Sequence, residues 1–327
     1  MRRLALAAAL FLAPAVTSFA TPALQPLVDR AVQTALDQFA AQKLLPTQFA
    51  LTLVDLSSSP SSPSPPSPTS PTSPTSSPSS PSSPSSPPRA SYRGDVPIYP
   101  ASVIKLFYLA AAHRWLEDGK LADTPELRRA MKDMIVDSSN DATHYIIDLL
   151  TGTTSGPELP DAEIKTWFDH RNAVTRYFAS LGYTGVLAHK KPWGDGPYGR
   201  ESQAIRLFEP KRNMLTTDAT ARLFAEIATG QCVTAARSAE MMTLLSRDPR
   251  TPDPDPDHQA KFTGPVLPPG AKLWSKAGWT SQTRHDAASI ELPNGAKFLL
   301  VIFTTDHANE RTLLHTVARV IVDGFVK

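Results

Sequence analysis

Apolar residues recur every three or four positions along much of the chain, the spacing that places side chains on one face of an α-helix. In the first such stretch they include Leu27, Val28 and Ala31. A stretch ends where the period fails or where a glycine follows, as at Gly182. We predict helices over residues 24–44, 102–119, 123–137, 161–181, 216–230, 235–245 and 309–327.

Other stretches have the short apolar runs that are typical of β-strands. They cover residues 49–56, 89–99, 272–278, 286–292 and 297–305. The order is a helix, two strands, a block of helices, three strands and a helix. This order predicts an α/β chain, an α+β sandwich in which both chain ends build an antiparallel sheet flanked by helices. The middle of the chain is expected to form an inserted all-helical domain.

Two stretches follow neither period. Residues 57–88 contain only serine, proline and threonine, and 12 of these 32 residues are proline, so we predict a disordered insertion within a loop. We expect it to have no role in catalysis, because long surface insertions cost little stability. Residues 190–206 are irregular and rich in glycine and aromatic residues, a composition that is typical of ordered loops.

The first 20 residues have the pattern of a secretory signal peptide. Arg2 and Arg3 precede an apolar run over residues 4–16, and Ser18-Phe19-Ala20 is a small-x-small cleavage site. We therefore expect cleavage after Ala20, one catalytic domain over residues 21–327, and a periplasmic or secreted protein. An uncleaved membrane anchor is the alternative. We expect no transmembrane span after signal cleavage, because no later stretch is long and apolar enough to cross a bilayer.

Charge and cysteine content narrow the possible partners. The chain has 33 basic and 31 acidic side chains, so its formal net charge is +2, and removal of the signal peptide lowers it to 31 − 31 = 0. This balance does not suggest a nucleic-acid partner. The single cysteine, Cys232, excludes an intramolecular disulfide and is expected in the core. The lone cysteine also makes a metal site built on cysteines unlikely.

The strongest chemical signal is Ser102-Val103-Ile104-Lys105, at the start of the almost entirely apolar helix over residues 102–119. Positions i and i+3 share a helix face, so the Ser102 hydroxyl and the Lys105 amine can approach each other. A buried lysine loses solvation and its pKa falls, which makes it a base for a neighbouring hydroxyl. The pair therefore predicts an activated serine nucleophile, although a chance match is the simpler interpretation of so short a motif.

Two further motifs follow in order: Ser138-Ser139-Asn140 at a helix cap, and Lys276-Ala277-Gly278 on a predicted strand. Together with Ser102 and Lys105, they resemble the signature S-x-x-K, S-D-N, K-T-G of the serine β-lactamase and penicillin-binding protein superfamily. The closest resemblance is to class A β-lactamase-like serine hydrolases, and it covers the chain from residue 21 onward except the insertion.

The resemblance implies a role for each residue. Ser102 attacks a carbonyl, and Lys105 takes its proton or holds the network that does. Ser138 relays a proton to the leaving nitrogen. Asn140 and Lys276 bind the substrate's side-chain amide and its carboxylate.

The resemblance also implies further substrate contacts on the last part of the site. Gly278 lets the strand approach the ligand closely. The backbone N–H groups of Ser102 and Trp279 form the oxyanion hole. Thr280 and Arg284 are candidates for binding the substrate carboxylate; a surface ion pair is the alternative for Arg284.

This sequence departs from the family pattern in several places. Ser139 replaces an aspartate and Ala277 replaces a threonine or serine, and both changes are mild. The spacing of 36 positions from Ser102 to Ser138 is shorter than in typical class A enzymes. A segment of the helical domain is therefore expected to be missing.

The deacylating glutamate is the most serious departure. Class A enzymes carry Glu-Pro-x-x-Asn on a loop before a Thr-Thr helix cap. Glu209-Pro210 matches the dipeptide but lies only seven positions before Thr216. Glu201 has a better spacing to Thr217 but lacks the proline and the later asparagine. We favour Glu201 as the base, with a structural ion pair as the alternative interpretation of either glutamate.

The sequence therefore predicts a β-lactamase-type serine hydrolase that cleaves the β-lactam amide through an acyl-Ser102 intermediate. With this resemblance we expect a monomer that acts on a small molecule and needs no metal or organic cofactor. One alternative is a D-Ala-D-Ala peptidase or amidase of the penicillin-binding type, which would acylate and then stall on β-lactams. Another alternative is a non-catalytic module that binds the cell wall.

Overall fold

The computed structural model describes residues 23–57, 87–194 and 196–326. The expected signal peptide lies outside the described residues, and so does the predicted insertion apart from residues 57, 87 and 88. The described chain has the following α-helices: α1 (Leu24–Gln38), α2 (Lys105–Glu117), α3 (Pro125–Ile135), α4 (Asn140–Thr151), α5 (Asp161–Arg171), α6 (Ala173–Ser180), α7 (Gly199–Leu207), α8 (Thr217–Ala228), α9 (Ala235–Leu245) and α10 (Arg311–Val326).

The strands form one antiparallel sheet in the order β2-β1-β6-β5-β4-β3. Their bounds are β1 (Phe49–Asp55), β2 (Arg89–Tyr92), β3 (Ser246–Arg247), β4 (Lys272–Trp279), β5 (Thr283–Glu291) and β6 (Lys297–Thr305). Short 3-10 helices are η1 (Pro46–Gln48), η2 (Ala101–Ile104), η3 (Gln259–Lys261) and η4 (Gly264–Val266). The chain's first and last strands lie side by side as β1 and β6, which confirms a sheet built from both ends.

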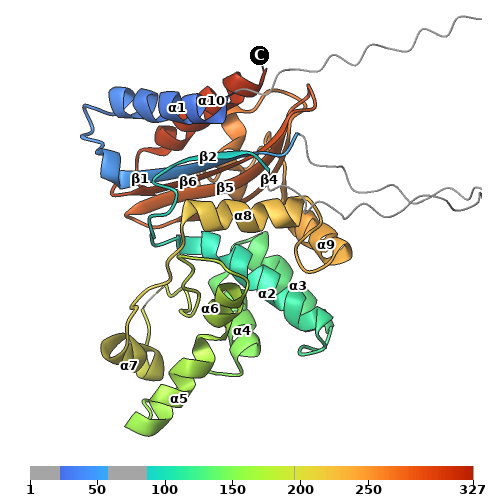
Figure 1. Cartoon of the computed structure of the whole chain (residues 1–327). Helices are drawn as coiled ribbons and strands as arrows, with labels where there is room; N and C mark the ends of the chain where they lie inside the picture. Colours follow the sequence, from blue (N-terminus) through green and yellow to red (C-terminus); the bar gives the residue numbers. More distant parts are fainter. Residues whose placement is uncertain (1–22, 58–86, 195, 327) are drawn as a thin grey trace, which may run out of the picture.

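Helices cover both faces of this sheet, as Figure 1 shows. On one face α1 and α10 lie next to each other over a core that includes Phe49, Leu300 and Val317. On the other face α8 lies against the sheet, and the helices α2 to α6 extend from it. The core on that side includes Phe107 and Phe224. This arrangement confirms the predicted mixed fold with a helical block inserted between the strands.

Most predicted elements lie close to their expected positions, but several differ. The strand predicted over 89–99 forms only β2, which ends at Tyr92, and the helix predicted over 24–44 ends at Gln38. The helix predicted over 161–181 is interrupted at Asn172, whose side-chain amide donates to Phe168 O (2.7 Å), so it forms α5 and α6. The segment predicted as irregular over 190–206 contains α7. The two-residue strand β3 was not predicted, because two residues carry no periodic signal.

Within the described ranges, the structure contains no helix long and apolar enough to cross a membrane. Cys232 is buried, as expected, and burial raises the pKa of its thiol to about 12. The thiol therefore stays protonated near neutral pH, which fits a packing role rather than a nucleophilic one.

Candidate active site

The predicted nucleophile lies where an extended segment turns into α2. Ser102 is the second residue of η2, a single 3-10 turn that runs directly into the helix, and its side chain is partly exposed. The residue before it, Ala101, has a φ of 45°, a left-handed conformation that is costly for a residue with a Cβ atom. Strain of this kind is concentrated at functional sites. Here it turns the backbone so that the Ser102 side chain remains accessible.

The Lys105 side chain is fully buried beneath the serine. Its ammonium group donates to the Ser138 backbone carbonyl and to Asn140 Oδ1 (2.9 Å), and Ser138 Oγ lies 3.2 Å from Nζ. Burial lowers the pKa of Lys105 to about 7. In the described chain, the hydrogen-bond partners of Nζ include neither Ser102 Oγ nor a carboxylate. A large fraction of Lys105 is therefore uncharged near neutral pH.

Ser138 connects the helical domain to the sheet. It has a φ of 56°, immediately before Ser139, whose Oγ caps α4 by accepting from Ala142 N (3.2 Å). The cap turns the chain so that the Ser138 hydroxyl points to both lysines of the site. Lys276 Nζ lies 3.0 Å from Ser138 Oγ, and Lys105 Nζ approaches the same atom from α2. The three sequence motifs therefore meet at one hydroxyl group.

The two lysines have matching sets of hydrogen-bond partners. Lys276 Nζ lies within 3.0 Å of Gln259 Oε1 and the Ala277 carbonyl, and Lys105 Nζ lies within 3.0 Å of the Ser138 carbonyl and Asn140 Oδ1. Each lysine also contacts the Ser138 hydroxyl. Because a hydroxyl both donates and accepts, it can accept from one lysine and donate to the lone pair of the other when that amine is neutral. A continuous hydrogen-bonded path therefore links the two lysines.

The last motif lies on β4. Lys276 is fully buried, and burial lowers the pKa of its ammonium, with the nearby charge of Lys105 lowering it further. Gly278 packs directly against the nucleophile's backbone. A Cβ atom at this position would lie 2.7 Å from Ser102 N and 2.8 Å from Val103 N. Only glycine therefore permits this approach of the strand to η2.

Hydrogen bonds along β4 establish which way its amides point. Thr280 N donates inward to Thr283 O (2.9 Å), whereas Ala277 N donates outward to Gln259 Oε1 (3.0 Å). Successive backbone amides of a strand point to opposite sides, so Trp279 N faces the same outer edge as Ala277 N. The close contact with Ser102 is made by the neighbouring residue, Gly278. The two predicted oxyanion donors are thus on adjacent backbone segments.

Glu201 lies in a buried ion-pair network away from this cluster. It is on α7, and its Oε1 accepts from Arg171 (2.8 Å) and from Ser155 Oγ (2.9 Å). Lys191 Nζ is 3.9 Å from the same oxygen. None of these partners belongs to the three motifs. The contacts correspond to the alternative interpretation, a structural ion pair, with Arg171 as the partner.

Glu209 also points elsewhere: its side chain is 74% exposed and it pairs with Lys211. Asn213, which the sequence analysis overlooked, completes the Glu-Pro-x-x-Asn pattern that begins at Glu209. Its buried amide accepts from His189 N (3.0 Å) and Lys190 N (2.8 Å) and donates to Lys190 O (2.8 Å). Asn213 thus fastens the loop to the preceding segment. Its position three residues after Pro210 is the sequence feature that could have identified it.

The segment 190–192 contacts α2 and α4, the helices that begin with Lys105 and Asn140. Tyr108, one turn beyond Lys105 on α2, donates to Lys190 O (3.1 Å). His144, one turn beyond Asn140 on α4, has its Nε2 2.6 Å from Pro192 O. The side chains that this segment brings are two lysines and a proline. It contributes no carboxylate next to the cluster.

The two residues expected to bind a carboxylate are already engaged. Thr280 Oγ1 accepts from Gln282 N (3.1 Å) and Thr283 N (3.2 Å) in the β4–β5 turn. Arg284 is only 3% exposed, and it donates to Asp257 Oδ1 (2.7 Å). Its pairing is therefore buried rather than on the surface. Arg284 is therefore not free to receive a substrate, whereas the Thr280 hydroxyl can still donate its hydrogen, either to Thr283 Oγ1 (3.1 Å) or to a ligand.

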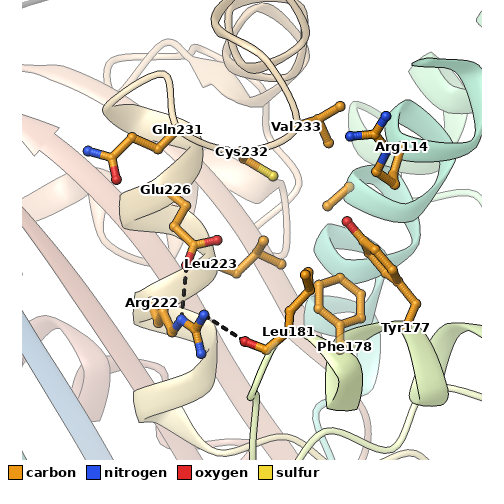
Figure 2. Close-up of a pocket in the computed structure, with 11 residues that line it drawn as sticks. Arg114, Tyr177, Phe178, Leu181, Arg222, Leu223, Glu226, Gln231, Cys232 and Val233 are labelled. Atoms are coloured by element: carbon orange, nitrogen blue, oxygen red, sulfur yellow. Dashed lines mark hydrogen bonds and ion pairs between the residues drawn. The ribbon is translucent and has the colours of Figure 1, made fainter. Parts of the chain in front are cut away.

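A cavity of about 390 Å³ lies elsewhere, between α2, α6 and α8 (Figure 2). Its polar walls are paired internally: Arg222 donates to Glu226 (2.9 Å) and to the Leu181 carbonyl (3.0 Å). Arg114, at its edge, is twelve residues beyond Ser102, roughly 18 Å along the helix at 1.5 Å per residue. This cavity is separate from the motif cluster.

Comparison with known proteins agrees with this geometry. The family model described as the beta-lactamase enzyme family matches residues 123–325, which is more than half of the chain. The matched range includes Ser138 and Lys276, whereas Ser102 and Lys105 precede it. No curated protein sequence matches the chain.

Solved structures share the fold along nearly their whole length. A beta-lactamase from Sphaerobacter thermophilus DSM 20745 is 17% identical with a TM-score of 0.60, and the match covers 92% of this chain and 98% of that one. A beta-lactamase from Xanthomonas campestris pv. campestris str. ATCC 33913 is 15% identical with a TM-score of 0.60, covering 91% and 98%. A point variant of PBP-A, in an acyl-enzyme complex with penicillin G, is 16% identical with a TM-score of 0.59, covering 91% and 97%. These likenesses establish the fold, and the family match establishes that the chain belongs to the beta-lactamase enzyme family.

Proposed function

We propose that this protein is a serine hydrolase of the class A β-lactamase type, which opens the β-lactam amide through an acyl-Ser102 intermediate. The observation that carries the proposal is the Ser138 hydroxyl, held 3.2 Å from Lys105 Nζ and 3.0 Å from Lys276 Nζ. A hydroxyl within hydrogen-bond distance of two buried lysines, beside a partly exposed serine, is suited to proton transfer. We further propose that the protein works in the periplasm or outside the cell.

Acylation follows from the positions of these groups. The uncharged Lys105 amine accepts the proton of Ser102 as Oγ forms a bond to the substrate carbonyl carbon. The backbone N–H groups of Ser102 and Trp279 stabilise the resulting oxyanion; one such donor is worth about 3 kcal/mol in comparable sites. The proton then moves from Lys105 through Ser138 to the substrate nitrogen as the carbon–nitrogen bond breaks. The product of these steps is an ester on Ser102.

Deacylation is where a second candidate function is favoured. Water must attack the ester, and a placed base is needed to activate it. The carboxylate of Glu201 is paired with Arg171, and that of Glu209 is exposed. A protein with these contacts would acylate and then release its product slowly, as a penicillin-binding protein does. The structural likeness to a PBP-A variant that forms an acyl-enzyme with penicillin G supports this alternative.

Intact-mass spectrometry and absorbance with a chromogenic cephalosporin test the proposal. We expect wild-type protein to gain one acyl group and Ser102→Ala to gain none. Ser180→Ala, an exposed serine at the end of α6, is the matched control and should behave as wild type. Continuous colour indicates a β-lactamase, whereas one stoichiometric burst with a lasting adduct indicates the penicillin-binding alternative. Wild-type protein that shows neither colour nor adduct refutes acylation of Ser102. Ligand binding that persists in Ser102→Ala without turnover in wild type indicates the non-catalytic module.

A further inference from the structure

Gln259 lies against the active-site strand, although no sequence motif contains it. It begins η3, and its side-chain Oε1 accepts from Lys276 Nζ (2.9 Å) and from Ala277 N (3.0 Å). The preceding residue holds the turn in place, because His258 Nδ1 accepts from Ala260 N (3.2 Å). One carboxamide oxygen therefore contacts two successive residues of the Lys-x-Gly motif.

These two contacts determine the orientation of the carboxamide. Both partners of Oε1 are donors, and a flipped amide would place its own N–H groups against the Lys276 ammonium and the Ala277 amide. The Nε2 group of Gln259 must therefore point away from Lys276 Nζ and Ala277 N. Among the described residues it donates to no acceptor, and it is not one of the buried polar atoms that lack a partner. Nε2 is thus an accessible donor close to the Lys276 side chain, which Oε1 of the same carboxamide contacts.

A donor at this position adds to the few that the rest of the site offers. Ala277 has no hydroxyl, although the family pattern has threonine or serine there. The Arg284 guanidinium is paired with Asp257, and the Thr280 hydroxyl has one hydrogen to donate, with Thr283 Oγ1 3.1 Å away. Lys276 is buried, and Ser138 Oγ lies 3.0 Å from its Nζ. A substrate carboxylate that approaches Lys276 would meet Gln259 Nε2 as an accessible side-chain donor.

We propose that Gln259 is a substrate-binding residue whose Nε2 donates to the substrate carboxylate while its Oε1 holds Lys276 in place. This inference rests on the proposed function, because it concerns the same site. The ligand chemistry is a carboxylate next to the scissile amide. Such a group could be the ring carboxylate of a β-lactam or the terminal carboxylate of a D-Ala-D-Ala peptide.

The test compares each acid with its neutral counterpart. The pairs are benzylpenicillin with its methyl ester, and a D-Ala-D-Ala peptide with its terminal amide. Gln259→Glu keeps an oxygen for Lys276 and Ala277 but replaces the Nε2 donor with an anionic oxygen. Acylation rates from intact mass give the preference for acid over neutral compound. We expect this preference to fall about 10-fold to 100-fold in Gln259→Glu, as for loss of a hydrogen bond to a charged group, while rates with the neutral compounds change little.

Two further variants separate binding from other effects. Gln231→Glu places the same added charge at an exposed position outside the motif cluster and should keep the wild-type preference. Gln259→Leu removes both functions of the side chain, so acylation by acid and neutral compounds should both fall, with the acid falling further. The added charge of Gln259→Glu beside Lys276 can by itself repel a carboxylate, so Gln259→Leu decides between the two roles. A role limited to holding Lys276 would leave the preference of Gln259→Leu unchanged. That result overturns the proposal.

A binding measurement keeps the inference independent of acylation. In Ser102→Ala protein, the fluorescence of the half-exposed Trp279 reports binding of the same pairs without a covalent step. If wild-type protein is not acylated, the proposed function fails, and the Gln259→Leu change made in the Ser102→Ala background still decides the inference. A drop in acid preference in one pair only identifies the carboxylate that the site recognises. Equal preferences with and without Gln259→Leu in both pairs refute it.

Discussion

The buried, uncharged Lys105 predicts how the acylation rate depends on pH. Its pKa is lowered from 10.5 to about 7 by burial, so the neutral amine that can accept a proton appears as the pH rises through this value. About one tenth of the side chains are neutral one pH unit below the pKa and about nine tenths one unit above it. The acylation rate should therefore rise about ninefold to tenfold between pH 6 and pH 8.

Stopped-flow acylation by a chromogenic cephalosporin measures this profile directly. Lys105→Arg retains the charge and the donors but cannot lose its proton, so we expect the rate to fall about 100-fold or more and its rise near pH 7 to disappear. Lys132→Arg, at an exposed position of α3, is the matched control. A wild-type rate that is constant or falls between pH 6 and pH 8 would refute Lys105 as the base.

The same pKa predicts a linked effect on stability. Below pH 7 Lys105 is protonated in both states, and folding has to bury the charge. Between pH 7 and 10.5 the unfolded chain binds a proton that the folded protein does not, so the free energy of unfolding rises with pH. Lys105 contributes about 1.4 kcal/mol per pH unit, or roughly 5 kcal/mol over the window. Denaturation at several pH values should show a smaller slope for Lys105→Met than for wild type, and equal slopes would contradict the assigned pKa.

Three further substitutions test the site's architecture. Gly278→Ala forces a Cβ atom to within 2.7 Å of Ser102 N, so the acylation rate should fall about 100-fold. Gly194→Ala, which has open space around it, is the control and should not change the rate. A normal acylation rate in Gly278→Ala would show that the strand can move aside. Glu201→Gln leaves a buried guanidinium without its carboxylate, which should cost about 3 kcal/mol in urea denaturation and leave the lifetime of the acyl-enzyme unchanged. Slower deacylation at full stability would instead support the glutamate as the base. Asn213→Ala removes three buried hydrogen bonds and should lower the free energy of unfolding by about 3 kcal/mol in the same assay. A decrease below about 0.5 kcal/mol would mean that other contacts hold the loop.

Features that depend on local spacing were predictable from the chain alone. The predicted bounds of α9 and β6 agree with the structure. The spacing of apolar residues, 3.6 positions in a helix and 2 in a strand, depends only on residues that are close together in the chain. Thr216 was expected to cap α8, and its hydroxyl accepts from Ala219 N (3.0 Å). The Ser-x-x-Lys motif placed Ser102 at the start of a buried helix for the same reason.

Segments stabilised by distant partners were harder to predict. The composition of α7 suggested a loop, because glycine and proline precede it and its apolar face is short. Two long-range contacts hold it: Glu201 with Arg171, and Gln203, whose amide accepts from Leu159 N (2.9 Å) and donates to Leu159 O (2.7 Å). The spacing of apolar residues within 199–207 does not indicate these distant partners.

The sequence by itself determined the family resemblance, the two-ended sheet and the residues of the three motifs. Only the tertiary structure decided how these residues meet: Lys105 and Lys276, 171 positions apart, share the Ser138 hydroxyl. It also gave Gln259 a place beside Lys276. The physical reason is that periodicity and capping act between neighbours in the chain. Hydrogen bonds and burial between distant residues depend instead on the path that the folded chain takes.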